Sequence, residues 1–390
     1  MRQSLMLEFP VSEYERRLKK LTREMNENNI DAVILTSDEN TYYFTGFNSI
    51  VWDSKVSTPG VVVITKDGSM TLSTSGGGVE TATVTSCVED IRMYGKNGYE
   101  TLIKAVVSIL SQKNIINGRI GLELGAGHKM HLNYYLQREL FEELRNAQLL
   151  DAANILWNVR SIKSPMEIER IRKACEINTI AIQKGLDMVV EGTTESELYR
   201  NIAQECFRLG ADRCLMYGVR AGDERYSQGN CPPSDRPIQA GDIILIDGGP
   251  IYRGYYSDII REAVIGKPTA YQQEMFDVAR EACYVGINKV KPGTPISEVC
   301  KAVDDFMDNS KFASINVYKN WVGHGIGVGV HEYPMLDITT HTLLEPGMVF
   351  AIEPYLFEKG VGSLGIEQNI LVTENGCEIL TNSKDELIRL

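Results

Sequence analysis

Long apolar runs, a secretion signal and paired cysteine motifs are all missing from this sequence of 390 residues. No stretch of eighteen apolar residues occurs, which argues against a membrane-spanning helix. The N-terminal segment has no basic start followed by an apolar core, so no secretory signal is visible and a cytoplasmic protein is expected. Eight cysteines are scattered without a CxxC pair, a pattern typical of reduced thiols rather than of a disulfide framework.

Positive charge is also in short supply. Lys and Arg number 40 against 52 Asp and Glu, which gives a formal net charge of −12. General nucleic-acid binding is therefore not expected, because attraction to phosphates requires a basic face. Solubility is the simplest explanation of the acidity. Low-complexity segments and short repeats are absent as well.

Two domains are expected from the length of the chain and from a change of pattern near residue 151. In the first part, helical patterns alternate with strands, and the segments TPGVVVIT and GSMTLST read as a hairpin. This alternation predicts an α/β domain over residues 1–155. Residues 156–390 begin with a long helix announced by Ser164 and Pro165, continue through further helices, and end in strand-rich segments.

Four acidic residues of the second part stand within apolar strands or at their ends: Asp247 after DIILI, Asp258 on the next strand, Glu353 in GMVFAIEPYLF and Glu367 in LGIEQNILVT. A carboxylate placed there is costly unless something neutralises it. The two aspartates alone could be turn or cap residues, and one glutamate could protect an edge strand. Four such residues together with His324 predict a converging cluster.

The charge of this cluster predicts what it binds. Four ionised carboxylates carry −4, and their repulsion would protonate some of them or unfold the site. Two divalent cations neutralise the set, whereas one leaves −2, so a dinuclear site is favoured. Oxygen ligands with one imidazole suit Mn²⁺, Co²⁺, Fe²⁺ or Zn²⁺, and the lack of cysteine argues against structural zinc. Two metals that share a water lower its pKa and supply hydroxide, which predicts hydrolysis.

The order of these five residues resembles a known family. Asp247, Asp258, His324, Glu353 and Glu367 are similar to the five metal ligands of the pita-bread metallopeptidases, which include methionine aminopeptidase, aminopeptidase P, prolidase and the metal-free relative creatinase. RSIKSPMEIERIRKACEI resembles the start of the catalytic domain in two-domain members, and YYFTGFNS resembles a strand and turn of their N-terminal domain. The resemblance covers essentially the whole chain. It implies a creatinase/prolidase-type α/β N-terminal domain and an α+β pita-bread catalytic domain.

The resemblance also implies roles for the two histidines of GHGIGVGVHEYP, residues 323–334. His324 would bind one metal, and His331 would donate a hydrogen bond or proton to the developing oxyanion or the leaving group. The glycines between them would let the backbone bend close to the site. Glu353 would serve both as a ligand and as the general base. A structural or surface role is the simpler alternative for His331.

Three departures from the family pattern concern the substrate side. Asn230 stands where peptidases of this family usually carry a further histidine, and no histidine occurs between His131 and His324. Gly365 stands where an arginine is frequent, and Ile260 where a threonine is usual. The metal set is intact, so metal binding is more strongly indicated than cleavage of a peptide bond.

The leading hypothesis is a dinuclear-metal-dependent Xaa-Pro peptidase, either a dipeptidase or an aminopeptidase, that uses a metal-bridging hydroxide on a small peptide. Manganese is the first expectation for the metal. The alternative is a non-peptide C–N hydrolase or lyase on the same scaffold, creatinase-like or ectoine-hydrolase-like, acting on a small amide-type metabolite. A binding module is disfavoured, because such relatives lose metal ligands and this chain keeps all five.

Residues for substrate binding are predicted mainly by analogy. Trp52 lies in the region from which two-domain relatives reach the active site of a partner subunit, so a homodimer is expected with Trp52 as a wall of the pocket. Ordinary domain packing is an equally good explanation of Trp52. Tyr217, Arg220 and Asn230 precede the first ligand and could line the pocket. Arg220 could hold a substrate carboxylate or pair with a nearby acid.

Overall fold

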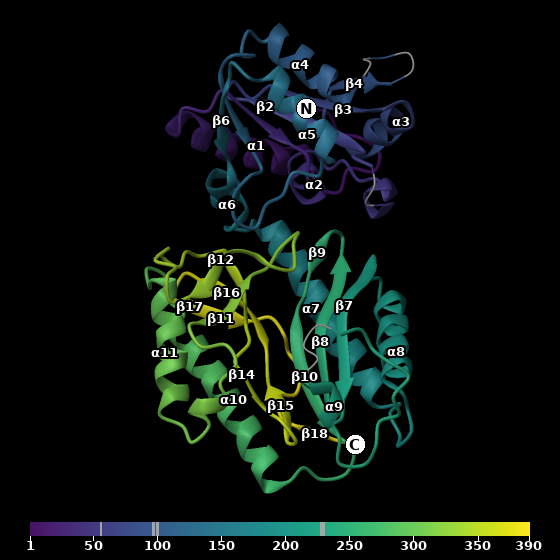
Figure 1. The fold of residues 1–390 in the computed structure, drawn as a ribbon, viewed down its shortest axis with the longest axis vertical. Coiled ribbons are helices and arrows are strands. Elements are labelled where there is room, and N and C mark those ends of the chain that lie inside the picture. The colour runs from purple at the N-terminus through teal and green to yellow at the C-terminus, as the bar shows by residue number, and fades with distance from the viewer. Residues whose placement is uncertain (55–56, 96–97, 99–100, 227–230) are drawn as a thin grey trace. The chain divides into compact units, whose positions relative to one another are not determined.

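The structure is a computed structural model that describes residues 1–54, 57–95, 98, 101–226 and 231–390 (Figure 1). The chain divides into the units Met1–Arg160 and Ser161–Leu390. The boundary expected between residues 155 and 156 falls inside α6 (Ala153–Arg160). Leu156 of this helix is fully buried, and Trp157 stacks on His128 with 4.2 Å between ring centroids. The whole of α6 is therefore part of the first unit.

The N-terminal unit is an α/β domain, as its sequence pattern predicts, built on a six-stranded sheet in the order β4-β3-β2-β1-β5-β6. β1, β2 and β3 pair antiparallel, including the expected hairpin, and the outer strands pair parallel. The helices are α1 Val11–Glu27, α2 Asp38–Thr45, α3 Gly76–Thr85, α4 Leu102–Gln112, α5 Tyr134–Glu143 and α6, with a 3₁₀ turn at Ile50–Ser54. The strands are β1 Ala32–Leu35, β2 Gly60–Thr65, β3 Met70–Ser75, β4 Asp90–Tyr94, β5 Arg119–Leu122 and β6 Gln148–Asp151.

The second unit, called the catalytic unit below, contains two larger sheets and helices that pack on them. Its helices are α7 Pro165–Leu186, α8 Glu195–Arg208, α9 Asp223–Tyr226, α10 Ala270–Lys289 and α11 Ile296–Asp308, with a 3₁₀ turn at Ala313–Ile315. Its strands are β7 Arg213–Ala221, β8 Ile243–Tyr252, β9 Tyr255–Tyr256, β10 Ile259–Val264, β11 Trp321–Gly325, β12 Glu332–Asp337, β13 Val349–Ile352, β14 Tyr355–Glu358, β15 Gly362–Gly365, β16 Gln368–Thr373, β17 Gly376–Ile379 and β18 Ile388–Arg389.

Each larger sheet of the catalytic unit has its own apolar core. The first sheet has the order β18-β10-β8-β7, with β9 beside β8, and its core joins it to α7 and α8. The second has the order β12-β11-β13-β16-β17, and its core joins it to α10 and α11. In Figure 1 α8 lies on one side of the strands, and α10 and α11 lie on the other. The two sheets therefore meet on their inner sides, away from the helices.

Helix starts in the catalytic unit follow the sequence signals. Ser164 caps α7 in a capping box with Glu167, and Thr194 does the same for α8 with Glu197. α8 ends next to Gly210, whose φ of +99° suits glycine. No helix in the described part of the chain combines the length and apolar character that crossing a bilayer requires.

Candidate metal centre

The five predicted ligands reach one place from both sheets of the catalytic unit. Asp247 lies within β8 and Asp258 directly precedes β10, so both come from the first sheet. The sequence suggested that Asp247 ends its strand, but β8 continues to Tyr252. Ile260 is the partner of Asp247 in the β8–β10 ladder, which brings Asp258 two residues further along the same face.

The second sheet contributes His324, Glu353 and Glu367. His324 lies in β11 opposite Ala351 of β13. Ile352 pairs with Gln368, so Glu353 and Glu367 follow at the point where the β13–β16 ladder ends. The Glu367 amide also donates to the Ile260 carbonyl at 3.4 Å, which joins the edge of the second sheet to β10. Strand pairing thus places the five side chains around one point.

One hydrogen bond fixes the tautomer of His324. The Nδ1 atom lies 2.9 Å from the Gly325 carbonyl oxygen, and a carbonyl can only accept, so Nδ1 carries the proton. Burial lowers the pKa of His324 to about 4, so the ring is neutral at neutral pH. Its unprotonated Nε2 then points at carboxylates, 3.2 Å from Glu353 Oε1 and 3.9 Å from Asp258 Oδ2. A lone pair facing carboxylate oxygens is repulsive unless a proton or a metal cation lies between them.

The buried position of the carboxylates makes their ionised forms unfavourable. Burial raises the pKa of Asp258, Glu353 and Glu367 well above the usual range, and neighbouring carboxylates of the cluster raise it further. Burial also raises the pKa of Asp247, while Arg220 and His324 act in the opposite direction. Glu367 and His324 are fully buried, and Asp258 is 5% exposed. Four carboxylates cannot all stay ionised here without positive charge.

The atoms of the cluster fit divalent ions. Within the described part of the chain, Asp258 Oδ1, His324 Nε2 and both carboxyl oxygens of Glu367 are buried without a hydrogen-bond partner. Two groups of possible ligand atoms lie within 4.8 Å of one another, Asp247–Asp258–Glu367 and His324–Glu353–Glu367. They share Glu367, so two adjacent ions could be held. A third group adds His331 to Asp258 and His324, which the sequence did not suggest.

The glycine-rich segment after His324 leaves room for an inward-pointing glutamate. A Cβ at Gly327 would lie 2.5 Å from Glu332 Oε2, and one at Gly325 would lie 2.8 Å from the Glu332 carbonyl oxygen. Glu332 is buried, accepts from the Gly329 amide at 3.0 Å, and pairs with buried Lys163 at 3.2 Å. These contacts anchor the turn that carries His331.

His331 faces the cluster from this turn. Its ring meets His324 edge-on, with 4.2 Å between ring centroids. Desolvation and, to a smaller extent, the His324 ring together lower the pKa of His331 to about 4. The ring is thus a neutral imidazole, which can donate one N–H to a group bound beside the carboxylates.

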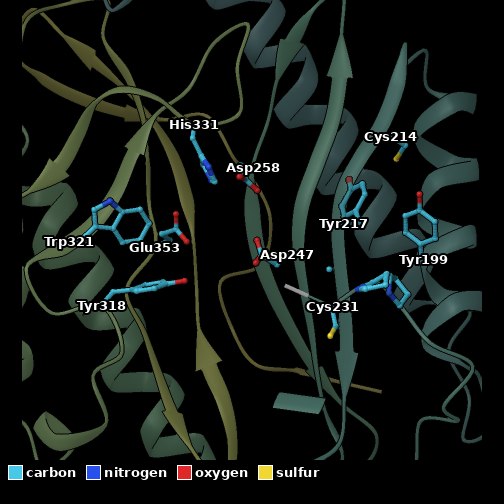
Figure 2. A pocket seen from close by; sticks show the side chains of 13 residues that line it. Tyr199, Cys214, Tyr217, Cys231, Asp247, Asp258, Tyr318, Trp321, His331 and Glu353 are labelled. Atoms are coloured by element: carbon cyan, nitrogen blue, oxygen red, sulfur yellow. The ribbon is translucent and has the colours of Figure 1, made fainter. Parts of the chain in front are cut away.

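A cavity of about 590 Å³ opens over the carboxylates (Figure 2). Asp247, Asp258, His331 and Glu353 point into it from its floor. Aromatic side chains line it from both sides, with Tyr318 and Trp321 beside Glu353 and with Tyr199 and Tyr217 across from them. Cys214, Gly218, Cys231, Pro232 and Pro233 complete the lining. The dimensions suit a small peptide or metabolite.

Two buried asparagines that the sequence analysis missed hold the backbone around the aspartates. Asn178 of α7 donates to the Gly248 carbonyl at 2.9 Å and to Ser257 Oγ at 3.2 Å. Asn369 of β16 donates to the Asp258 carbonyl at 2.5 Å and accepts from the Asp258 amide at 3.1 Å. Neither carries a local sequence signal, because an isolated Asn in a helix or strand resembles any polar residue.

The residues predicted for the substrate side lie in different surroundings. Tyr217 lines the cavity and donates to Asn178 Oδ1 at 2.5 Å. Arg220 is buried on β7, and its Nη2 lies 3.9 Å from Asp247 Oδ2. Trp52 belongs to the N-terminal unit, where it is 6% exposed and meets His131 edge-on at 5.2 Å. Asn230 lies outside the described residues.

Comparison with known proteins gives matches over both units. Residues 17–162 match the Creatinase/Prolidase N-terminal domain, and residues 169–374 match Metallopeptidase family M24. The Xaa-Pro dipeptidase of Pyrococcus horikoshii is 29% identical over 372 residues, covering 95% of this chain and 98% of that protein. The structure of an Xaa-Pro dipeptidase from Bacillus anthracis has a TM-score of 0.85 at 27% identity, covering 97% of this chain and 100% of that one. The prolidase of Pyrococcus horikoshii OT3 has a TM-score of 0.81 at 27% identity, covering 96% and 100%.

These matches confirm the resemblance drawn from the sequence and the two-domain architecture. The family match alone spans more than half of the chain. The N-terminal match accounts for most of the first unit. The chain belongs to metallopeptidase family M24.

Proposed function

We propose that this metallopeptidase cleaves Xaa-Pro bonds in small peptides, as a dipeptidase or an aminopeptidase. The observation that carries the proposal is the cluster of four carboxylates with the unprotonated His324 Nε2, from which Asp247, Asp258 and Glu353 line the cavity. Relatives of nearly the same length named Xaa-Pro dipeptidase support the choice of bond.

In this proposal two ions occupy the cluster. Asp247, Asp258 and Glu367 would hold one, and His324, Glu353 and Glu367 would hold the other. Mn²⁺ is the first choice, because the donors are mostly carboxylate oxygens, while Co²⁺, Zn²⁺ and Fe²⁺ also suit this set. Divalent ions held here would neutralise the carboxylates and supply a water of lowered pKa as the hydroxide nucleophile.

Two side chains at the cavity would handle protons. The Glu353 carboxyl group, whose pKa burial and Asp247 raise, would accept a proton from the attacking water and pass it toward the leaving nitrogen. The His331 N–H would donate to the substrate carbonyl oxygen as negative charge develops on it. The Tyr318 and Trp321 rings beside Glu353 would exclude water from one side of the reacting bond.

A second candidate is hydrolysis of a non-peptide C–N bond in a small amide-type metabolite. It is favoured by Gly365, where Tyr355 Cβ fills the space that a side chain of residue 365 would need. It is also favoured by Asn230 in place of a histidine. The two candidates share the metal cluster and differ only in the ligand that the cavity accepts.

A cytoplasmic homodimer completes the proposal. The cytoplasmic location is supported by eight cysteines that are all free thiols. The dimer is supported only by analogy with two-domain members of the family. Gel filtration with light scattering would test it, because a mass near 43.6 kDa would indicate a monomer.

The experiment that tests the proposed function combines metal analysis with activity. Wild-type protein, Asp258→Asn and the control Asp187→Asn would be assayed for metal content and for Mn²⁺-dependent cleavage of Xaa-Pro dipeptides and tripeptides. Asp187 is an exposed residue at the end of α7, so its variant should behave as wild type. Asp258→Asn should lose both hydrolysis and bound metal.

The possible results separate the candidates. About two ions per chain with Xaa-Pro cleavage would support the proposal, following the ligand count above. Two ions without peptide cleavage would direct the search to small amides and amidines. Full activity of a metal-stripped Asp258→Asn sample would refute the metal mechanism.

A further inference from the structure

Arg220 shares the inner face of the first sheet with two acidic side chains. It pairs with Leu245 across the β7–β8 ladder, and Glu262 pairs with the same leucine across the β8–β10 ladder. Residues directly opposite in antiparallel strands point to one face, and so do residues two apart on a strand. Arg220, Glu262 and Asp247 therefore lie on one face, around Leu245.

Within the described part of the chain, neither acid near Arg220 forms an ion pair with another basic side chain. Arg220 Nη2 lies 3.9 Å from Asp247 Oδ2, and the arginine side chain is only 6% exposed. Glu262 is 1% exposed, and neither of its carboxyl oxygens has a hydrogen-bond partner within the described residues. The guanidinium lies on the same face as both acids and 3.9 Å from Asp247, so its positive charge attracts them. An arginine stays charged at every pH a folded protein meets.

Neither Arg261 nor position 365 of β15 supplies positive charge to these two acids. Arg261 donates to the Ile260 and Glu367 carbonyls at 2.8 and 2.7 Å, so it serves the backbone. β15 cannot supply a side chain at Gly365, because a Cβ there would lie 2.2 Å from Tyr355 Cβ. Among the described residues, Arg220 of β7 is the basic side chain that faces these acids.

We propose that Arg220 is a positioning residue that acts through its charge, as the permanent cation that keeps Asp247 and Glu262 buried in the ion-free protein. The inference rests on the proposed function in one respect, namely that the cluster binds divalent ions. Arg220 and the ions are both positive, so the buried carboxylates depend less on either one when the other is present. Loss of Arg220 should therefore lower the stability of the ion-free protein more than that of the ion-bound protein.

The test compares thermal midpoints in EDTA and in saturating Mn²⁺ for wild type, Arg220→Met, Arg220→Lys and Arg236→Met. Arg236 pairs with Asp242 at 2.6 Å outside the cluster and is the matched control. We expect Arg220→Met to lower the midpoint in EDTA by about 5–10 °C and to recover most of this loss in Mn²⁺. Arg220→Lys, which keeps the charge, should lose less, and Arg236→Met should lose equally in both conditions. Calorimetric titration should show that Arg220→Met binds Mn²⁺ at least as tightly as wild type.

Three results would overturn the inference. They are an equal loss for Arg220→Met with and without Mn²⁺, a loss for Arg220→Lys as large as for Arg220→Met, and weaker Mn²⁺ binding by Arg220→Met. A wild-type midpoint that does not respond to Mn²⁺ would instead remove the ion site, and with it the proposed function. Failure of the inference and failure of the proposed function thus give different results.

Discussion

Replacing Asn369 by alanine should weaken both the fold and the metal site. The Asn369 side chain is fully buried and joins four groups: the amide and carbonyl of Asp258, Ser257 Oγ at 3.2 Å and Cys175 Sγ at 3.3 Å. Asn369→Ala leaves the two backbone groups of Asp258 buried without these partners. Each unsatisfied buried group costs about 1–3 kcal/mol, and part of this is recovered by relaxation. We expect a loss of about 3–5 kcal/mol in the free energy of unfolding.

The metal affinity of Asn369→Ala should fall as well. The Asn369 side chain holds both the backbone N–H and the backbone C=O of Asp258. Without it, the Asp258 carboxylate loses its fixed position. Residues that orient metal ligands change affinity by about 10- to 100-fold, and we expect a change of that size for Mn²⁺. Urea denaturation followed by circular dichroism would measure the first effect, and calorimetric titration the second.

Asn309→Ala is the matched control for this prediction. Asn309 follows α11, is exposed, and donates to the Asp305 carbonyl at 2.6 Å. Its loss should cost about 0.5 kcal/mol or less. If Asn369→Ala were no less stable than Asn309→Ala and bound Mn²⁺ as wild type does, the role given to the buried asparagine would be wrong.

Three further predictions concern the cavity and its supports. His331→Ala should lower turnover by roughly 10²- to 10⁴-fold with metal content unchanged, and unchanged turnover would make His331 a structural residue. Lys163→Met should destabilise the protein to urea by about 3–5 kcal/mol, because it removes the buried ion pair and leaves the Glu332 carboxylate without a counter-charge. The double variant Lys163→Met/Glu332→Leu should recover part of that loss, and a double variant as unstable as the single one would contradict this account. Asn230→His should raise Xaa-Pro cleavage if that histidine is the group the site lacks, which a dipeptide assay measures directly.

The main elements and the candidate ligands could be predicted because their signals are local. A carboxylate inside an apolar run is unusual on its own, and capping residues such as Ser164 mark a helix start within four positions. Burial of charge by tertiary contacts could not be predicted. Arg17 reads as part of the charged face of α1, yet it is fully buried, since Glu13 pairs with it at 3.0 Å and the Tyr43 ring lies 4.1 Å away. The contacts of Asn178 and Asn369 likewise join segments 39 to 194 positions apart, which no local pattern encodes.

The contact between Gly365 and Tyr355 constrains how this protein can evolve. A side chain at 365 collides with the Cβ of Tyr355 at 2.2 Å and with the Pro354 carbonyl oxygen at 2.9 Å. The arginine that the family often carries at this position therefore does not fit unless the backbone of residues 354 and 355 shifts. Such a shift would also move Tyr355, which donates to Tyr318 Oη at 3.1 Å on the cavity wall. Substitution at 365 is thereby coupled to the β14 backbone and, through Tyr355 and Tyr318, to the shape of the substrate pocket.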